Sequence, residues 1–352
     1  MIDSVKYFAK VLLLCGIASL VACSLVDEDM RDCDADYQMD YTLELVTNVS
    51  TELETQFENV PLGTEIISAL RSFLGNVFTD KAHDVDLSFY DVEGDSLRLF
   101  HQSLIMDASE TNYTLYIPRR QYMHVALANL DKVGVLKVEK GDTCKKATLE
   151  QPVRDTVDSH RTGMFTARLP MDIQQQGDQE FNVVLYMANC ACALVLDTLG
   201  SGVKDVKVYT SGFATGMSVA DSVYRFPYTP IVRTSQVKVS EDPQAPLCFV
   251  SVNFPSRSVP PKTKTVIETD DPFVSDVADE ALWNYRVYAT LEDGSITQTL
   301  IGVKVPLHPG QFKAVRANIV QDGSAAPLSS KSEMAVNVTL DWNPGMSWDV
   351  EL

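Results

Sequence analysis

The stretch DVDLSF, residues 84–89, alternates polar and apolar side chains and places Val85, Leu87 and Phe89 on one face. A period of two is typical of a strand that buries one of its faces. The same pattern recurs at Tyr113, Leu115 and Ile117, at Tyr285, Val287, Ala289 and Leu291, and at Val336, Val338, Leu340 and Trp342. Glycine-containing turns lie at residues 93–95, 292–294 and 321–323. The sequence therefore predicts an all-β protein of antiparallel β-sandwiches.

Two stretches depart from this period. Between residues 61 and 75, the apolar residues Ile66, Ile67, Leu70, Phe73 and Leu74 recur at helical spacing, and Gly75 is a plausible helix stop. The second stretch begins at Asp271-Pro272 and carries Phe273, Val277, Ala281 and Leu282. We expect short helices in crossovers, although an irregular loop explains the second stretch equally well.

The length of 352 residues suits two domains of ordinary size. A polar stretch, QQQGD at residues 174–178, precedes an apolar strand that starts near Asn189. We therefore expect one sandwich domain at residues 37–188 and a second at residues 189–352.

The amino terminus reads as an export signal. Two lysines precede an apolar run that is too short for a confident membrane span, and the run ends in Leu20-Val21-Ala22-Cys23. This ending resembles the bacterial lipobox, which implies a signal peptide at residues 1–22 and a lipid on Cys23; a plain signal peptide that contains a cysteine is the alternative. Residues 23–36 are rich in aspartate. They resemble a surface-export signal of lipoproteins in the Bacteroidota, or form a solvated acidic tether.

Charge and motifs exclude several classes of function. The formal charge of −19 argues against a nucleic-acid partner. None of the common hydrolase, nucleotide-binding or zinc-protease motifs is present, and the five histidines His83, His101, His124, His160 and His308 are dispersed. The sequence thus predicts a protein that is not an enzyme, with no catalytic residues, no metal site and no cofactor.

Cysteine usage leaves the redox state open. Without Cys15 and the acylated Cys23, five thiols remain: Cys33, Cys144, Cys190, Cys192 and Cys248. Because five is an odd number, at least one is free. Cys190-Ala191-Cys192 has the look of a redox or metal pair, but two small buried thiols on an apolar strand are the preferred interpretation. A Cys33–Cys144 disulfide is possible, and the connectivity stays open.

The tryptophans Trp283, Trp342 and Trp348 are the candidates for a carbohydrate platform. Trp342 continues an alternating strand face, so a core position is the preferred interpretation there. Trp348 lies near the carboxyl terminus, where partial exposure is expected.

The order of features along the whole mature chain is familiar. The lipobox is followed by DCD at residues 32–34, a strand at 37–46, VDLSFYDVEG at 85–94, YTLYIP at 113–118 and VALAN at 125–129. VKVYTSGFA at 206–214 and LHPGQF at 307–312 extend the comparison. This order resembles the FimB-like fimbrial anchor and minor-subunit lipoproteins of type V pili in Bacteroidales. Asp34 departs from the family pattern, in which proline commonly follows the early cysteine.

The resemblance implies two tandem transthyretin-like β-sandwiches, lipidated at Cys23 and displayed on the outer membrane as part of a fimbrium. It transfers no catalytic residue, and it leaves open whether the chain is a basal anchor or a tip or accessory subunit. We expect the chain to anchor or nucleate a pilus by capturing pilins through β-strand addition. The terminal segments Val336–Trp342 and Tyr41–Val46 are expected to lie at a sheet edge or to rearrange. A surface glycan-binding lipoprotein of a nutrient-uptake system is the alternative.

Overall fold

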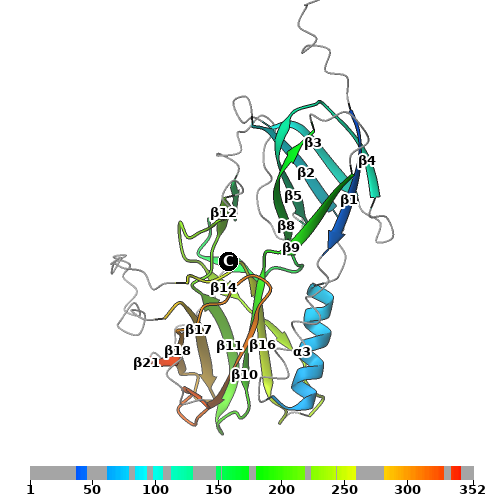
Figure 1. Cartoon of the computed structure of the whole chain (residues 1–352). Helices are drawn as coiled ribbons and strands as arrows, with labels where there is room; N and C mark the ends of the chain where they lie inside the picture. The colour runs from blue at the N-terminus through cyan, green and yellow to red at the C-terminus, as the bar shows by residue number, and fades with distance from the viewer. Residues whose placement is uncertain are drawn as a thin grey trace, which may run out of the picture.

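The computed structural model describes residues 37–45, 62–78, 84–92, 98–105, 112–129, 148–151, 153–173, 180–218, 223–242, 244–258, 281–328 and 334–341. These residues form β-strands and one helix, arranged as two sandwiches stacked end to end (Figure 1). The prediction of an all-β protein with sandwich layers is thereby confirmed. The signal peptide 1–22, Cys23 and the tether 23–36 lie outside the described residues.

The N-terminal sandwich is one seven-stranded sheet folded over on itself. Its strand order is β3 (Arg98–Ile105), β2 (Asp84–Asp91), β5 (Gln121–Ala128), β8 (Phe165–Asp172), β9 (Glu180–Met187), β1 (Tyr37–Leu45) and β4 (Asn112–Ile117). β8 and β9 pair at only two positions, which are Phe165 and Thr166 of β8. The sheet turns there into its second layer. Val85, Leu87 and Phe89 are fully buried in the core, as their alternation predicts.

β1 corrects one expectation about the edges. It pairs antiparallel with β4 and parallel with β9, so it lies inside the sheet. The expectation that Tyr41–Val46 forms an edge is therefore wrong as far as Leu45, and Val46 lies outside the described residues. A segment that comes first in the chain need not be outermost in the sheet, because later strands pair on both of its sides.

The C-terminal sandwich has two separate sheets. The first runs β15 (Ser235–Val237), β16 (Leu247–Asn253), β10 (Cys190–Leu196), β19 (Phe312–Ile319) and β20 (Ala325–Pro327). The second runs β21 (Met334–Asp341), β18 (Ile296–Val303), β17 (Trp283–Leu291), β11 (Val203–Ser211), β14 (Ile231–Arg233) and β7 (Thr156–Asp158). Tyr285, Val287 and Ala289 are fully buried between the sheets, which confirms the predicted alternation as far as Ala289, whereas Leu291 is half-buried.

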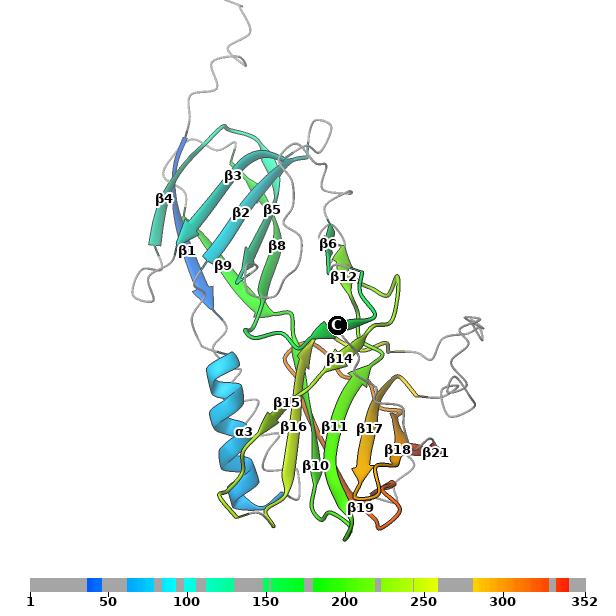
Figure 2. The same cartoon turned by 180° about the vertical axis from the view of Figure 1, so that it is seen from behind.

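The helix α3 (Thr64–Val77) comes from the first half of the chain but packs on the second half. Its apolar face, with Ile66, Leu70 and Leu74 buried, shares a core cluster with β10 and β16. Both views show α3 alongside β15 and β16 (Figures 1 and 2). Because α3 covers the outer face of this sheet, every residue of β10 is buried. That burial explains why β10 is continuously apolar in sequence.

Gly75 does not end the helix, contrary to the expectation from sequence. The helix continues to Val77, and Phe78 caps it through a backbone bond to the Leu74 carbonyl oxygen. Of the second expected helix, residues 271–280 lie outside the described part of the chain. Ala281 and Leu282 are not helical.

Two short strands also come from the first half. β6 (Thr148–Glu150) pairs with β12 (Gly216–Ser218), which in turn pairs with β13 (Val223–Arg225), and β7 pairs in parallel with β14. A third core cluster, which includes Tyr90, Val125 and Phe254, joins the two sandwiches. The boundary at residues 188 and 189 remains a prediction, and the stretch 174–178 lies outside the described residues.

Candidate functional site

Unpaired sheet edges are the candidate contact surface of this protein. Within the described ranges, eight strands lie at the end of a sheet: β3, β4, β15, β20, β21, β7, β13 and β6. Five of them, β6, β7, β13, β15 and β20, are only three residues long. β20 also ends in Pro327, which has no amide hydrogen to donate. β3, β4 and β21 therefore present the longest rows of backbone groups to a partner strand.

β3 and β4 lie on the same side of the N-terminal sandwich. They are the two ends of a sheet that turns over between β8 and β9, so the side opposite that turn carries both edges (Figure 1). β4 pairs with β1 at six positions, from Asn112 to Ile117. Its exposed residues alternate with buried Leu115 and Ile117, and the Tyr116 side chain is 56% exposed. An added strand at β4 would meet both backbone groups and an aromatic side chain.

β21 is the long edge of the C-terminal sandwich. It pairs with β18 along its whole length, from Met334 opposite Val303 to Asp341 opposite Ile296. The expectation that Val336–Trp342 forms an edge is confirmed as far as Asp341. Trp342 lies outside the described residues.

The three described cysteines are buried free thiols. Burial raises the pKa of Cys192 and of Cys248 to about 12, and it raises that of Cys190 well above its usual range. A thiol of that pKa stays protonated and is a poor nucleophile or metal ligand. The interpretation of Cys190 and Cys192 as small core thiols is confirmed, whereas Cys33 and Cys144 lie outside the described residues.

Trp283 is an interior residue and cannot belong to a carbohydrate platform. Its side chain is fully buried, its Nε1–H donates to the Val305 carbonyl oxygen at 2.9 Å, and its ring contacts those of Phe213 and Tyr285. Trp342 and Trp348 lie outside the described residues.

His124 is a core histidine of the N-terminal sandwich. Its ring stacks on Phe89 with centroids 4.2 Å apart, and Nδ1 lies 3.1 Å from the Ser88 carbonyl oxygen. Burial lowers the pKa of His124 to about 3, so the ring is neutral at physiological pH.

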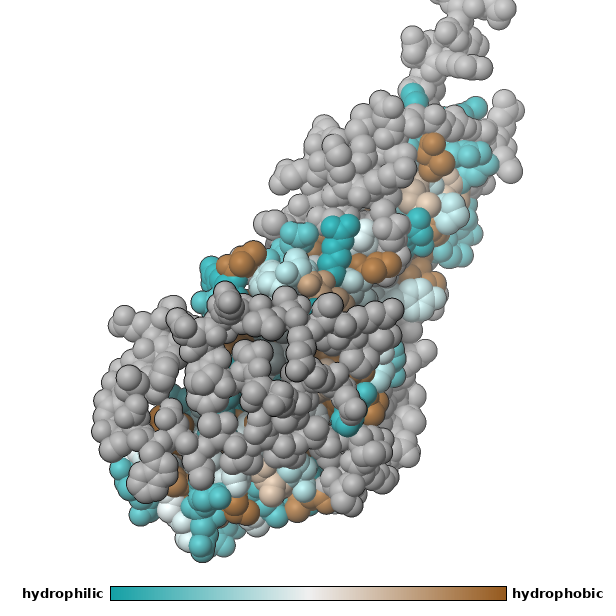
Figure 3. Space-filling view, turned by 90° about the vertical axis from the view of Figure 1, so that its left-hand side faces the viewer, coloured by the Kyte–Doolittle hydropathy of each residue, from teal (hydrophilic) through white to brown (hydrophobic). Residues whose placement is uncertain are grey.

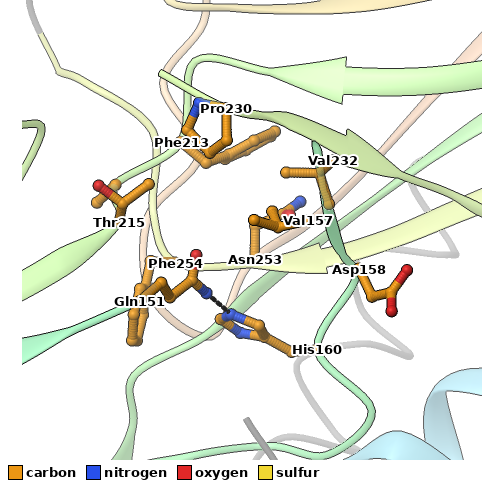
Figure 4. Close-up of a pocket in the computed structure, with 11 residues that line it drawn as sticks. Gln151, Val157, Asp158, His160, Phe213, Thr215, Pro230, Val232, Asn253 and Phe254 are labelled. Carbon is orange, nitrogen blue, oxygen red and sulfur yellow. Dashed lines mark hydrogen bonds between the residues drawn. The ribbon is translucent and has the colours of Figure 1, made fainter. Parts of the chain in front are cut away.

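His160 lies at the junction of the two sandwiches. Its Nδ1 is 2.7 Å from the Asn189 side-chain nitrogen, and its Nε2 contacts the side-chain amide of Gln151 (Figure 4). Asn189 Oδ1 accepts a bond from the Met164 amide, which turns the Asn189 NH₂ group toward His160. Nδ1 is therefore the acceptor and Nε2 carries the proton, so the Gln151 amide must turn its oxygen toward Nε2 in place of the nitrogen drawn in Figure 4. Burial lowers the pKa of His160 to about 4.

This network fixes the crossing between the domains. Asn189 stands directly between β9 and β10, its carbonyl oxygen accepts from Gly310, and the amide of His160 donates to the Val252 carbonyl oxygen of β16. The space beside it, shown in Figure 4, holds only about 10 Å³, which is room for a single water. Sequence reasoning missed this site because its residues are scattered along the chain. The one available signal was a polar Asn189 before a continuous apolar run.

Larger surface features are few in the described chain. No helix there is both long and apolar enough to cross a membrane, and no cluster of three or more potential metal ligands occurs. Exposed large apolar residues are scattered over different elements, and on the face shown in Figure 3 the hydrophobic spots are separate. Sheet edges and polar cavities are therefore better candidates for a binding surface than an apolar patch.

The sequence matches no family model and no curated protein. Among solved structures, it superposes on a candidate adhesin from Bacteroides thetaiotaomicron with a TM-score of 0.50 and 11% identity, covering 86% of this chain and 96% of that one. The chain shares the fold of that protein. A candidate polysaccharide-binding protein from the same species (TM-score 0.49, 11% identity) covers 87% of this chain and 99% of its own. The fimbrial anchor protein Mfa2 from Porphyromonas gingivalis (TM-score 0.46, 9% identity) covers 86% of this chain and 99% of its own. The resemblance predicted from the sequence is confirmed at the level of the fold.

Proposed function

We propose that this chain is a non-enzymatic fimbrial lipoprotein that holds a pilus subunit at the cell surface by β-strand addition. The observation that carries the proposal is the pair of long free edges, β3 and β4, on one side of the N-terminal sandwich. A strand laid against such an edge satisfies its unpaired amide and carbonyl groups, and alternate side chains set specificity. The shared fold with a candidate adhesin and the family resemblance of the sequence support the same class of role.

The proposed attachment to the outer membrane rests on the sequence alone. A lipobox at Cys23 would supply an acyl anchor in the outer membrane, and residues 24–36 would separate it from β1 at Tyr37. Cys23→Ser should then leave a protein that is soluble, uncut or mislocalised. Unchanged outer-membrane fractionation together with unchanged palmitate labelling would show that Cys23 is not the anchor.

Pilin capture by proline variants tests strand addition and locates the edge. Thr114→Pro in β4 and Val338→Pro in β21 each remove one backbone donor, and the melting temperature of each variant shows whether its fold survives. Loss of capture in a folded Thr114→Pro protein would assign the contact to the N-terminal edge, and loss in Val338→Pro to the C-terminal edge. Full capture by both folded variants would refute strand addition at these edges.

Deletion of the gene tests the anchoring role in the cell. Filaments should be shed into the medium while subunit synthesis continues. If the deletion strain kept its cell-attached pili unchanged, the anchoring role would be refuted and an accessory or glycan-binding role would be favoured.

A further inference from the structure

A cavity of about 310 Å³ opens between α3, the segment after β7 and the β14–β15 connection. Phe73 and Val77 of α3 form its apolar wall. Its polar wall comprises Asp158, Ser159, His160, Arg161, Arg233, Thr234 and Ser235. Its volume lies at the lower end of the range for small-molecule sites, which often form where domains meet. The cavity is thus of a size for one small ligand.

The walls of the cavity are held in place by the backbone of the neighbouring strands. Ser159 Oγ accepts the Val252 amide at 2.8 Å, and Thr234 Oγ1 donates to the Val208 carbonyl oxygen at 2.6 Å. These two hydroxyls are therefore engaged in building the site. A preformed frame of this kind lowers the entropic cost of binding.

Three polar groups at the mouth remain available to a ligand. Arg161 and Ser235 are exposed, and neither side chain has a hydrogen bond or ion pair with another part of the described chain. Arg233 pairs with Asp158 at 3.0 Å, but both side chains are largely exposed, so this pair adds little stability and can yield to a ligand. The cavity lining contains two guanidinium groups and one carboxylate, so it is basic, whereas the whole chain has a formal charge of −19.

We infer that this cavity binds a sugar that carries a carboxylate, such as a uronic or sialic acid. A guanidinium binds a carboxylate through paired, charge-assisted hydrogen bonds, and Arg161 is free to do so. Asp158 and Ser235 can hydrogen-bond to sugar hydroxyls, while the ring of Phe73 offers an apolar surface to the C–H face of the sugar. The lining thus matches a ring with one acid group, several hydroxyls and one apolar face.

Titration of the full chain with glucuronate, N-acetylneuraminate, glucose and acetate, followed by ligand-observed NMR or calorimetry, tests the inference. Glucose has the ring of glucuronate without its carboxylate, and acetate has a carboxylate without a ring. We expect at least one sugar acid to bind at millimolar concentration, and glucose and acetate to bind at least about tenfold more weakly. No binding of either acid up to roughly 10 mM, or equal binding of acetate, would overturn the inference.

Arginine variants locate the site. Arg161→Gln should weaken binding of the sugar acid at least about tenfold, because it removes a charged hydrogen-bond donor. Arg225→Gln is the matched control, since Arg225 is also exposed and does not line the cavity. If the only role of Arg161 is to neutralise the partial negative charge at the carboxyl end of α3, Arg161→Gln will lower the melting temperature and leave binding of the sugar acid unchanged. That result would refute the inference. Pilin capture should be unaffected by Arg161→Gln, so the two proposals fail separately.

Discussion

Leu70→Ala should loosen α3 from the sheet that it covers. Leu70 is fully buried, and its core cluster includes the thiol-bearing Cys248 on β16. Truncation of a buried leucine to alanine costs about 2 to 5 kcal/mol in transfer free energy and cavity formation. A loss of about 2 kcal/mol is enough to raise the open fraction of a segment about thirtyfold.

Alkylation rates, resolved peptide by peptide by mass spectrometry, measure this opening. Cys248 should be labelled faster in Leu70→Ala, whereas Cys190, which lies between the two sheets, should change less. Ser72→Ala on the exposed side of α3 is the control and should leave both rates unchanged. An unchanged Cys248 rate, or an equal rise at both thiols, would refute the idea that α3 opens separately from the sandwich.

Three further variants probe the helix, the domain junction and the core. Gly75→Ala should stabilise the protein by roughly 0.5 to 1 kcal/mol in urea unfolding, because Gly75 is exposed inside α3 and an added Cβ meets open space; a destabilised variant would contradict this. Since the pKa of His160 is about 4 in the folded protein and 6.5 in the unfolded chain, its contribution to stability is present above pH 6.5 and lost as the pH falls toward 4. The cost of His160→Gln should therefore shrink by roughly 3 kcal/mol between pH 7 and pH 4, at about 1.4 kcal/mol per pH unit, and a pH-independent cost would show that this histidine titrates normally. Trp283→Phe should cost roughly 2 to 4 kcal/mol in the same unfolding assay, because it leaves a void and strands the Val305 carbonyl oxygen; an unchanged midpoint would contradict the buried hydrogen bond.

Strand identity was predictable from sequence because alternation reflects a local property, burial on one side. Val85, Leu87 and Phe89 share a face, and that face is the core. The position of a strand within its sheet is a non-local property. Nothing in residues 37–45 shows that β4 and β9 will pair on both sides, so the edge could not be identified from position in the chain.

The helix shows the same division between local and distant causes. Its apolar spacing predicts α3, but the spacing says nothing about which surface it will cover. Gly75 misled the prediction of the helix end because packing of Leu74 and Val77 outweighs the small cost of an interior glycine. The polar cavity beside Arg161 could not be foreseen, since its walls come from three stretches that are far apart in sequence.

The position of β1 bears on how a pilus could be held. In the proposed arrangement, tension on a strand added at β4 passes directly to β1, because β4 pairs with β1 at six positions. β1 begins at Tyr37, 14 residues after Cys23. A fully extended chain of 14 residues is at most about 50 Å long. The path from partner to membrane would then run through one strand pair pulled along its length, without crossing the domain junction. Capture at β21 would instead pass the same tension through Asn189 and the His160 network. The N-terminal edge is for this reason the mechanically simpler of the two attachment points.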